Sequence, residues 1–168
     1  MKRATILGIL IAIGSVSIAV KAAQQPAPPQ PSADNLTVEK VKDNLFVLRG
    51  GGGNTAVFVQ ARGVTLVDTK NPGWGQPLLD KVRTLTDKPV TTVINTHMHY
   101  DHVSGNVAMP ASTEIIAHAN AARIIASPSP VTGLGGTPAN VFKDNPGKGL
   151  PKRTYTDKLT LGSGADQV

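Results

Sequence analysis

The stretch that decides the fold is His97-Met98-His99-Tyr100-Asp101-His102-Val103-Ser104-Gly105-Asn106. Three of the four histidines of the protein fall within six positions there, a carboxylate lies between them, and a turn of small residues follows. Neutral imidazole nitrogen and carboxylate oxygen bind borderline cations such as zinc at about 2.0–2.2 Å. Because ligands this dense in sequence can converge on one point, the stretch predicts a metal site built from a single loop.

Composition limits what that loop can belong to. The chain has 168 residues, of which 40% are hydrophobic, enough for one domain with a buried core. The net charge is +6, but removing three of the 17 basic residues with an N-terminal leader leaves 14 against 11 acidic residues. No basic run with interleaved aromatic residues remains, which argues against a nucleic-acid partner. Cysteine is absent, so any metal must be held by histidine and carboxylate.

Residues 1–23 have the pattern of an export signal. Lys2 and Arg3 precede an uncharged apolar run over 4–20, and Ala22 and Ala23 offer a small-residue cleavage site. We expect a periplasmic or secreted protein with no membrane attachment after cleavage. The alternative is an uncleaved membrane anchor, although such a run makes only about 25 Å of helix, short of a bilayer core of about 30 Å.

A Pro/Gln-rich linker is expected over 24–35, followed by a single domain over 36–168. Alternating apolar and polar residues predict two hairpins. The first joins 36–42 to 45–48, and the second joins 56–60 to 63–67. Four consecutive glycines at 50–53 lack the Lys-Ser/Thr and the following helix of a phosphate-binding loop, so we interpret them as a flexible turn.

The next segments alternate between helical and extended patterns. A helix is predicted around Leu78, Leu79, Val82 and Leu85, and a buried strand over 90–95 leads into the histidine loop. Ligand sites of layered α/β proteins often lie at such strand ends. Three further elements are expected: a strand over 114–117, a helix over 120–126 with Asn120 as a candidate N-cap, and a strand over 159–161. Residues 131–151 are Gly/Pro-rich and irregular.

The motif over 96–106 resembles the His-x-His-x-Asp-His signature of the metallo-β-lactamase-fold hydrolases, including its small-residue tail. The preceding hairpins, the strand ending at Asp68, the helix and the buried strand follow the order of that family. The resemblance implies an α/β protein of the αββα sandwich type, with one or two zinc ions at the edge of its sheets. It also implies a small-molecule substrate.

The resemblance assigns a role to each matching residue. His97 and His99 would bind a first zinc ion, Asp101 and His102 a second, and Asp68 would orient the loop through outer-shell hydrogen bonds. Zinc lowers the pKa of its bound water to about 7 and polarises the carbonyl under attack. Asp101 would also orient the hydroxide, which makes it the candidate catalytic residue. Without cysteine, the set resembles that of glyoxalase-II-like and lactonase-like members and of one β-lactamase subgroup.

The chain departs from the family after the motif. A full member has a third histidine and a bridging aspartate in a Gly/Ala-His-Thr-x-Gly-Asp stretch, and a final histidine later. Here the one later histidine is His118, between Ala117 and Ala119. We interpret His118 as a strand-end or helix-cap residue, because it lies between regular elements and not in such a stretch. The expectation is the N-terminal half to two-thirds of the sandwich, incomplete at its C-terminal end.

Two functional hypotheses follow. The first is a secreted zinc hydrolase of esters, thioesters, lactones or lactams, present as an incomplete chain. The second is a non-catalytic secreted metal-binding domain, or a truncated remnant without activity. Specificity would reside in loops above the metals, and Trp74 in the loop 71–75 is either an apolar wall of the site or a core residue.

Overall fold

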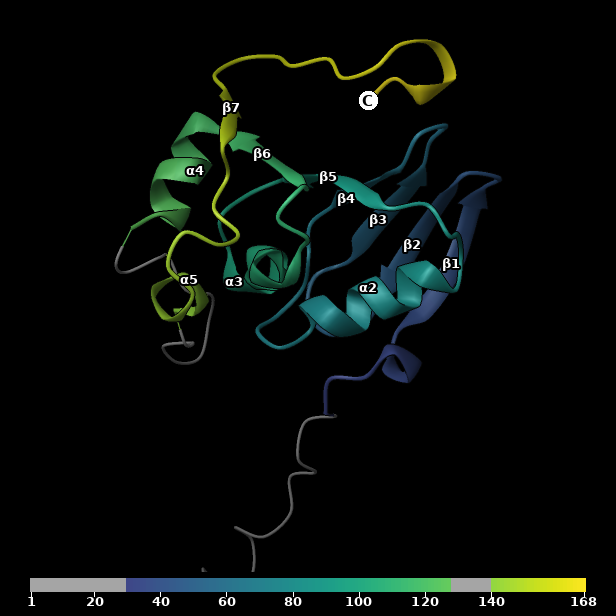
Figure 1. Ribbon diagram of the computed structural model, residues 1–168, viewed down its shortest axis with the longest axis horizontal. Helices are drawn as coiled ribbons and strands as arrows, with labels where there is room; N and C mark the ends of the chain where they lie inside the picture. The colour runs from purple at the N-terminus through teal and green to yellow at the C-terminus, as the bar shows by residue number, and fades with distance from the viewer. Residues whose placement is uncertain (1–29, 128–139) are drawn as a thin grey trace, which may run out of the picture. The chain divides into compact units, whose positions relative to one another are not determined.

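The structure is a computed structural model that describes residues 30–127 and 140–168 (Figure 1). The expected signal peptide, most of the linker and the first part of the irregular segment lie outside the described residues. No helix within the described ranges is long and apolar enough to cross a membrane. A short 3-10 helix, η1 (Ala33–Asn35), comes first and leads into the buried Leu36.

Seven strands form one sheet and follow each other across it in chain order (Figure 1). The first four strands make an antiparallel meander, which confirms both predicted hairpins, and the last three are added in parallel. The mixed α/β class is confirmed, and the described residues form one layer of strands. The strands are β1 (Thr37–Lys42), β2 (Leu45–Arg49), β3 (Thr55–Val59), β4 (Val64–Val67), β5 (Val90–Asn95), β6 (Glu114–His118) and β7 (Arg153–Tyr155).

The register of the sheet separates two apolar rows, one on each face, because successive residues of a strand point to opposite sides. On one face, partners in neighbouring strands are Phe46, Val57, Leu66, Val93 and Ile115. The last four belong to the main hydrophobic core, and Phe46 packs against it. On the other face, the adjacent positions form a second row, Val47, Ala56, Val67, Ile94 and Ile116. Both faces of this sheet are therefore apolar.

Helix α2 (Gly75–Arg83) covers the core face and lies in front of the antiparallel strands in Figure 1. Its buried residues Leu78, Leu79 and Val82 fall at the spacing predicted from the sequence and pack in the core. Trp74, which precedes the helix, is only 7% exposed and belongs to the same core cluster. Of its two interpretations, core packing is the one that holds.

Short helices follow the parallel strands. The histidine loop contains α3 (Tyr100–Val103) and the 3-10 helix η2 (Ser104–Ala108), and α4 (Ala119–Ile125) follows β6 directly. The N-cap of α4 is His118, whose side chain accepts a hydrogen bond from the backbone of Asn120. The prediction of Asn120 as the cap was wrong, whereas the strand-end and cap role of His118 is confirmed. Helix α5 (Val141–Asp144) begins the second described range.

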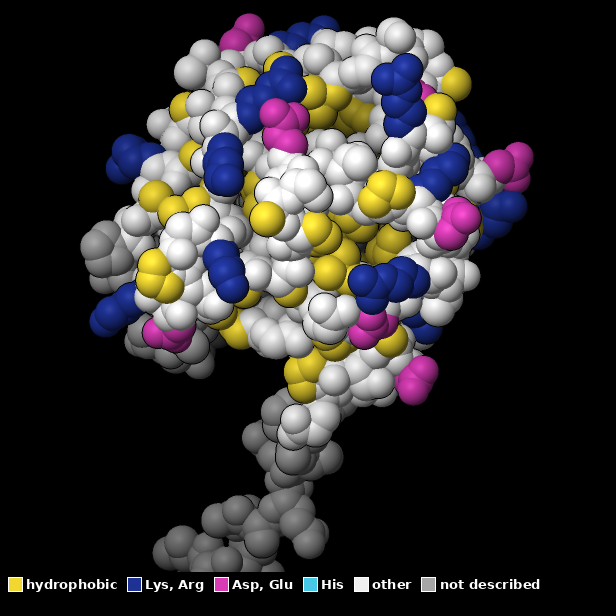
Figure 2. All heavy atoms as spheres, in the orientation of Figure 1, with side chains coloured by type: hydrophobic (Ala, Val, Ile, Leu, Met, Phe, Trp, Pro, Cys, Tyr) yellow, Lys and Arg dark blue, Asp and Glu magenta, His cyan; other side chains and the backbone are white. Residues whose placement is uncertain are grey.

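The predicted strand over 159–161 is not formed. Leu161 exchanges two backbone hydrogen bonds of 2.9 Å with Val168, closing a loop that contains the 3-10 helix η3 (Gly164–Asp166). This segment pairs with itself, and the place beside β6 belongs to β7. The apolar side chains of Leu159 and Leu161 instead line a hollow of about 290 Å³ with Ile94 and Ile116. Figure 2 shows hydrophobic side chains in a hollow beneath the C-terminal segment, at the top of the view.

Candidate metal centre

The candidate residues gather where two adjacent parallel strands end. Asp68 directly follows β4, and His97 comes two residues after β5. The two strands pair in parallel, so their carboxyl ends meet at the same edge of the sheet. The sheet therefore brings a carboxylate and the start of the histidine loop together, although Asp68 and Thr96 are 28 positions apart in the sequence.

The loop folds back onto the end of β4. Thr69 donates a backbone hydrogen bond of 2.7 Å to the carbonyl of His102, and Gly105 donates one of 3.3 Å to the carbonyl of Lys70. A Cβ atom at Gly105 would overlap the Thr69 carbonyl oxygen, so only glycine permits this approach. The hydroxyl of Thr69 and the amides of Asn95 and Asn106 then form a buried hydrogen-bonded group beneath the loop.

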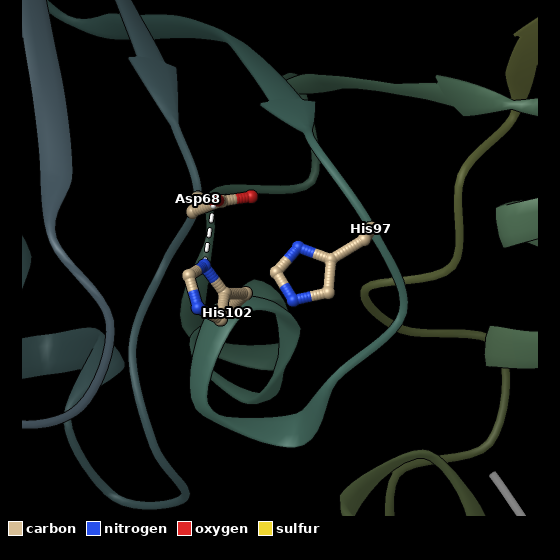
Figure 3. Close-up of side chains that lie close together, drawn as sticks. All are labelled: Asp68, His97 and His102. Atoms are coloured by element: carbon tan, nitrogen blue, oxygen red, sulfur yellow. Dashed lines mark hydrogen bonds and ion pairs between the residues drawn. The ribbon is translucent and has the colours of Figure 1, made fainter. Parts of the chain in front are cut away.

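Asp68 connects the parts of the site through the hydrogen bonds to its carboxylate (Figure 3). This residue is buried, with 4% exposure. Its two carboxylate oxygens accept hydrogen bonds from the backbone N–H of Thr96 at 2.9 Å and from the Thr96 hydroxyl at 2.7 Å. Nδ1 of His102 lies 2.8 Å from Oδ2. A carboxylate that accepts from Nδ1–H fixes the histidine tautomer and leaves the lone pair of Nε2 for a metal ion.

Thr96 also fixes the tautomer of His97. Because the Thr96 hydroxyl donates its hydrogen to Asp68, it must accept at its contact of 2.8 Å with His97 Nδ1. His97 then carries its proton on Nδ1, and its Nε2 offers a lone pair, which faces His99 Nδ1 at 3.1 Å. Figure 3 shows the rings of His97 and His102 side by side below Asp68, and their centroids are 4.2 Å apart.

The four candidate donor atoms form two close pairs. His97 Nε2 lies 3.1 Å from His99 Nδ1, and His102 Nε2 lies 3.3 Å from the Asp101 carboxylate. Two ligands at about 2.0–2.1 Å from one tetrahedral zinc ion would be about 3.3 Å apart. Histidine and carboxylate donors at this spacing fit zinc, in the pairing implied by the sequence motif.

The electrostatic environment favours the metal-binding form of His97. Burial lowers the pKa of His97, the neighbouring rings of His102 and His99 lower it further, and Asp68 and Asp101 act in the opposite direction. Neutral imidazole is the form that binds a metal ion. Proton release therefore opposes metal binding at His97 less than it would at an isolated histidine.

The placement of Asp68 favours an orienting role over direct ligation. One ligand atom each from Asp68, His97 and His102 lies within 4.8 Å of the others, the one such group of three or more within the described residues. The oxygens of Asp68, however, already accept three hydrogen bonds. His118 is no part of this group: its Nδ1 caps α4, and its Nε2 lies 3.0 Å from the carbonyl of Thr156.

Three further residues belong to the site although the sequence interpretation did not single them out. Thr96 precedes the first histidine, and a hydroxyl beside a metal ligand could have drawn attention to it. Gly53 belongs to the glycine turn (residues 50–53), and a Cβ atom there would overlap the ring of His102. Lys70 is completely buried beneath that turn. The turn is confirmed, but it is packed against Trp74, Asn71 and His102.

Comparison with known families agrees with this geometry. Residues 48–153 match the model of the metallo-beta-lactamase superfamily. The chain belongs to this superfamily. The match includes β3 to β6, α2 and the whole histidine loop, so the family resemblance of the motif is confirmed over most of the domain. No curated protein sequence matches the chain.

Solved metallo-β-lactamases share the fold. A metallo-beta-lactamase from Pontibacter korlensis is 19% identical with a TM-score of 0.60, and the match covers 79% of this chain and 58% of that one. The class B3 di-zinc enzyme LRA-12 from an Alaskan soil metagenome is 16% identical with a TM-score of 0.62, over 86% of this chain and 55% of that one. The chain thus spans little more than half the length of these superfamily members.

Proposed function

We propose that this chain belongs to a secreted, zinc-dependent hydrolase of the metallo-β-lactamase superfamily. The observation that supports it most strongly is the pairing of donor atoms: His97 with His99 at 3.1 Å and His102 with Asp101 at 3.3 Å. Each pair would contribute two ligands to one zinc ion. The expected export segment over 1–23 supports a location outside the cytoplasm.

The residues of the chain divide the work between binding and orientation. Asp68 holds the proton on Nδ1 of His102 directly and on Nδ1 of His97 through Thr96, so that both Nε2 atoms are available. Asp101 would bind the second ion. It would also accept a hydrogen bond from the attacking water and so orient the lone pair of that water. Zinc, when bound, supplies a hydroxide near neutral pH and polarises the carbonyl of the substrate.

The substrate class proposed is a small molecule with an activated carbonyl: an ester, thioester, lactone or lactam. Several structural neighbours are named as β-lactamases, including a di-zinc enzyme, and this name favours the lactam. Fold-level similarity alone does not select among these carbonyl compounds.

The proposal is tested by metal analysis and hydrolysis with the whole 168-residue chain. We expect stoichiometric zinc after dialysis, and turnover of a chromogenic lactam or thioester. His97→Ala and His99→Ala should each remove the first ion, because only two described donors face it. A chain that retains no zinc, or one in which neither substitution alters zinc content, would disprove the proposed site.

A second function is favoured by the number of donors. Catalytic zinc sites use three protein ligands and keep one open position, whereas the described residues present two donors in each close pair. A non-catalytic metal-binding domain fits this count. Stoichiometric zinc without hydrolysis of either substrate class would favour this second function over the first.

A further inference from the structure

Lys70 is an unusual residue to find at zero exposure, because an ammonium group is strongly hydrated in water. Burial lowers the pKa of this ammonium to about 8, while the nearby Asp68 raises it. The Nζ atom donates two hydrogen bonds of 2.7 Å, to the carbonyls of Leu48 and Gly53. Leu48 comes shortly before the glycine turn and Gly53 is its last residue, so the side chain of Lys70 ties the two ends of the turn together.

The end of the turn that Lys70 holds is pressed against a candidate ligand. Gly53 contacts the ring of His102 so closely that a Cβ atom would overlap Cε1, Nε2 and Nδ1. The backbone N–H of Gly53 also donates a hydrogen bond of 3.1 Å to the carbonyl of Asp101. The glycine turn therefore contacts both residues of the second donor pair, Asp101 and His102, through Gly53.

Three hydrogen bonds connect Lys70, Gly53 and the histidine loop in a closed circuit. Lys70 Nζ donates to the Gly53 carbonyl, and the Gly53 N–H donates to the Asp101 carbonyl. The N–H of Gly105, four residues after Asp101, donates to the carbonyl of Lys70 at 3.3 Å. His102 lies in the segment between Asp101 and Gly105 that these hydrogen bonds enclose, and its carbonyl accepts a hydrogen bond from the N–H of Thr69. The imidazole is thus fixed at Nδ1 by Asp68 and across its plane by Gly53.

We propose that Lys70 is a positioning residue of the metal centre, which seats Gly53 against His102 and Asp101 and so sets the affinity for the second metal ion. The proposal rests on the proposed metal-binding role of these two residues. Lys70 itself contacts no candidate donor atom with its side chain. Its influence would pass through the glycine turn, as outer-shell partners of metal ligands generally act.

The first test is made without metal, on Lys70→Met in the whole chain. Methionine keeps an unbranched stem and removes the donor. We expect shifted imidazole nitrogen resonances of His102 and faster amide hydrogen exchange at Gly53. The amide signals of β4 and β5 should be unchanged. Lys42→Met, at an exposed position of β1, is the matched control and should match the wild type. A folded Lys70→Met with wild-type His102 and Gly53 signals would overturn the proposal.

The second test is a cobalt titration followed by visible absorption. In Lys70→Met we expect the second ion to bind about 10–100-fold more weakly and the first ion to be unaffected. Gly53→Ala should have the same selective effect by displacing the ring of His102. Gly63→Ala is its control, because a Cβ atom there meets the Thr91 side chain at 2.5 Å, a comparable clash on another part of the sheet. Equal weakening of both ions in Lys70→Met would indicate a general structural role and refute positioning.

The two tests separate this inference from the proposed function. A wild-type chain that takes up no cobalt disproves the proposed function, and the metal-free spectra still decide whether Lys70 seats His102. If Lys70→Met fails to fold, Lys70→Arg provides the same comparison, because it retains the charge but its longer side chain displaces the Gly53 carbonyl. Unchanged His102 resonances in folded Lys70→Arg would then refute the inference.

Discussion

Asp68 combines an unfavourable backbone conformation with a fully used side chain. Its φ of 66° lies in the left-handed region, where a non-glycine residue costs free energy. The three hydrogen bonds to its carboxylate, from Thr96 and His102, offset that cost. Backbone strain and ligand orientation therefore coincide in Asp68, and the nearby Lys70 adopts the same left-handed region with a φ of 82°.

Asp68→Asn tests the orienting role. Asparagine tolerates the left-handed conformation but removes the charge and replaces one acceptor with a donor. We expect zinc affinity to fall about 10–100-fold, because the tautomers of His102 and His97 are no longer fixed. Competition with a chromogenic chelator measures it, and Asp80→Asn on the exposed side of α2 is the control. Wild-type affinity in Asp68→Asn would contradict the role.

Lys70 predicts a dependence of stability on pH. The native ammonium releases its proton at about pH 8, whereas the unfolded chain holds it until its ordinary pKa of 10.5. Between these values the unfolded state binds more protons, so the free energy of unfolding attributable to Lys70 rises with pH, by up to about 3 kcal/mol. Urea unfolding of the wild type and of Lys70→Met should therefore diverge from pH 8 upward. Parallel curves would contradict the shifted pKa.

At the scale of elements, the cap of α4 separates a structural histidine from the candidate ligands. His118→Ala should lower the free energy of unfolding by about 1 kcal/mol, because the first turn of α4 loses its side-chain acceptor. His118→Asn should recover most of that loss, since asparagine is a favoured cap. Zinc content should be unchanged in both variants, as measured by metal analysis. Loss of zinc in His118→Ala would show that this residue is a ligand.

The elements found from sequence are those whose residues repeat with a local period. The two hairpins and β5 have alternating or β-branched patterns, and α2 has its buried residues at helical spacing. Strand β7 was missed because it is three residues long and is held by pairing with β6 rather than by a pattern of its own. The segment 159–161 has the apolar pattern of a strand but does not join the sheet, because Leu161 pairs with Val168.

The site divides in the same way. The motif over 97–102 is local, so its residue types and spacing could be recognised in sequence. The roles of Thr96, Gly53 and Lys70 depend on which strand ends meet and on what becomes buried. Nothing in a lysine after Asp68-Thr69 indicates complete burial. Only the folded sheet brings the glycine turn against His102.

At the scale of the whole molecule, the second apolar row of the sheet is only partly covered. Val47, Val67 and Ile94 in this row are partly exposed, and a hollow lies beside Ile94 and Ile116. We expect the folded chain to enhance the fluorescence of a hydrophobic dye. Ile94→Lys should reduce that enhancement, and Val38→Lys, at an exposed valine of β1, should not. Equal fluorescence in both variants would argue against dye binding at this face.

The arrangement of the candidate ligands within six positions affects how zinc would stabilise the chain. An ordinary metal site exists only after folding, and the binding energy then adds in full to stability. Here His97, His99, Asp101 and His102 remain neighbours in the unfolded chain, which can still chelate the ion. A ligand that binds both states stabilises only by the difference between its two affinities. The rise in melting temperature with zinc would therefore measure how well Asp68, Thr96 and the glycine turn aim the ligands.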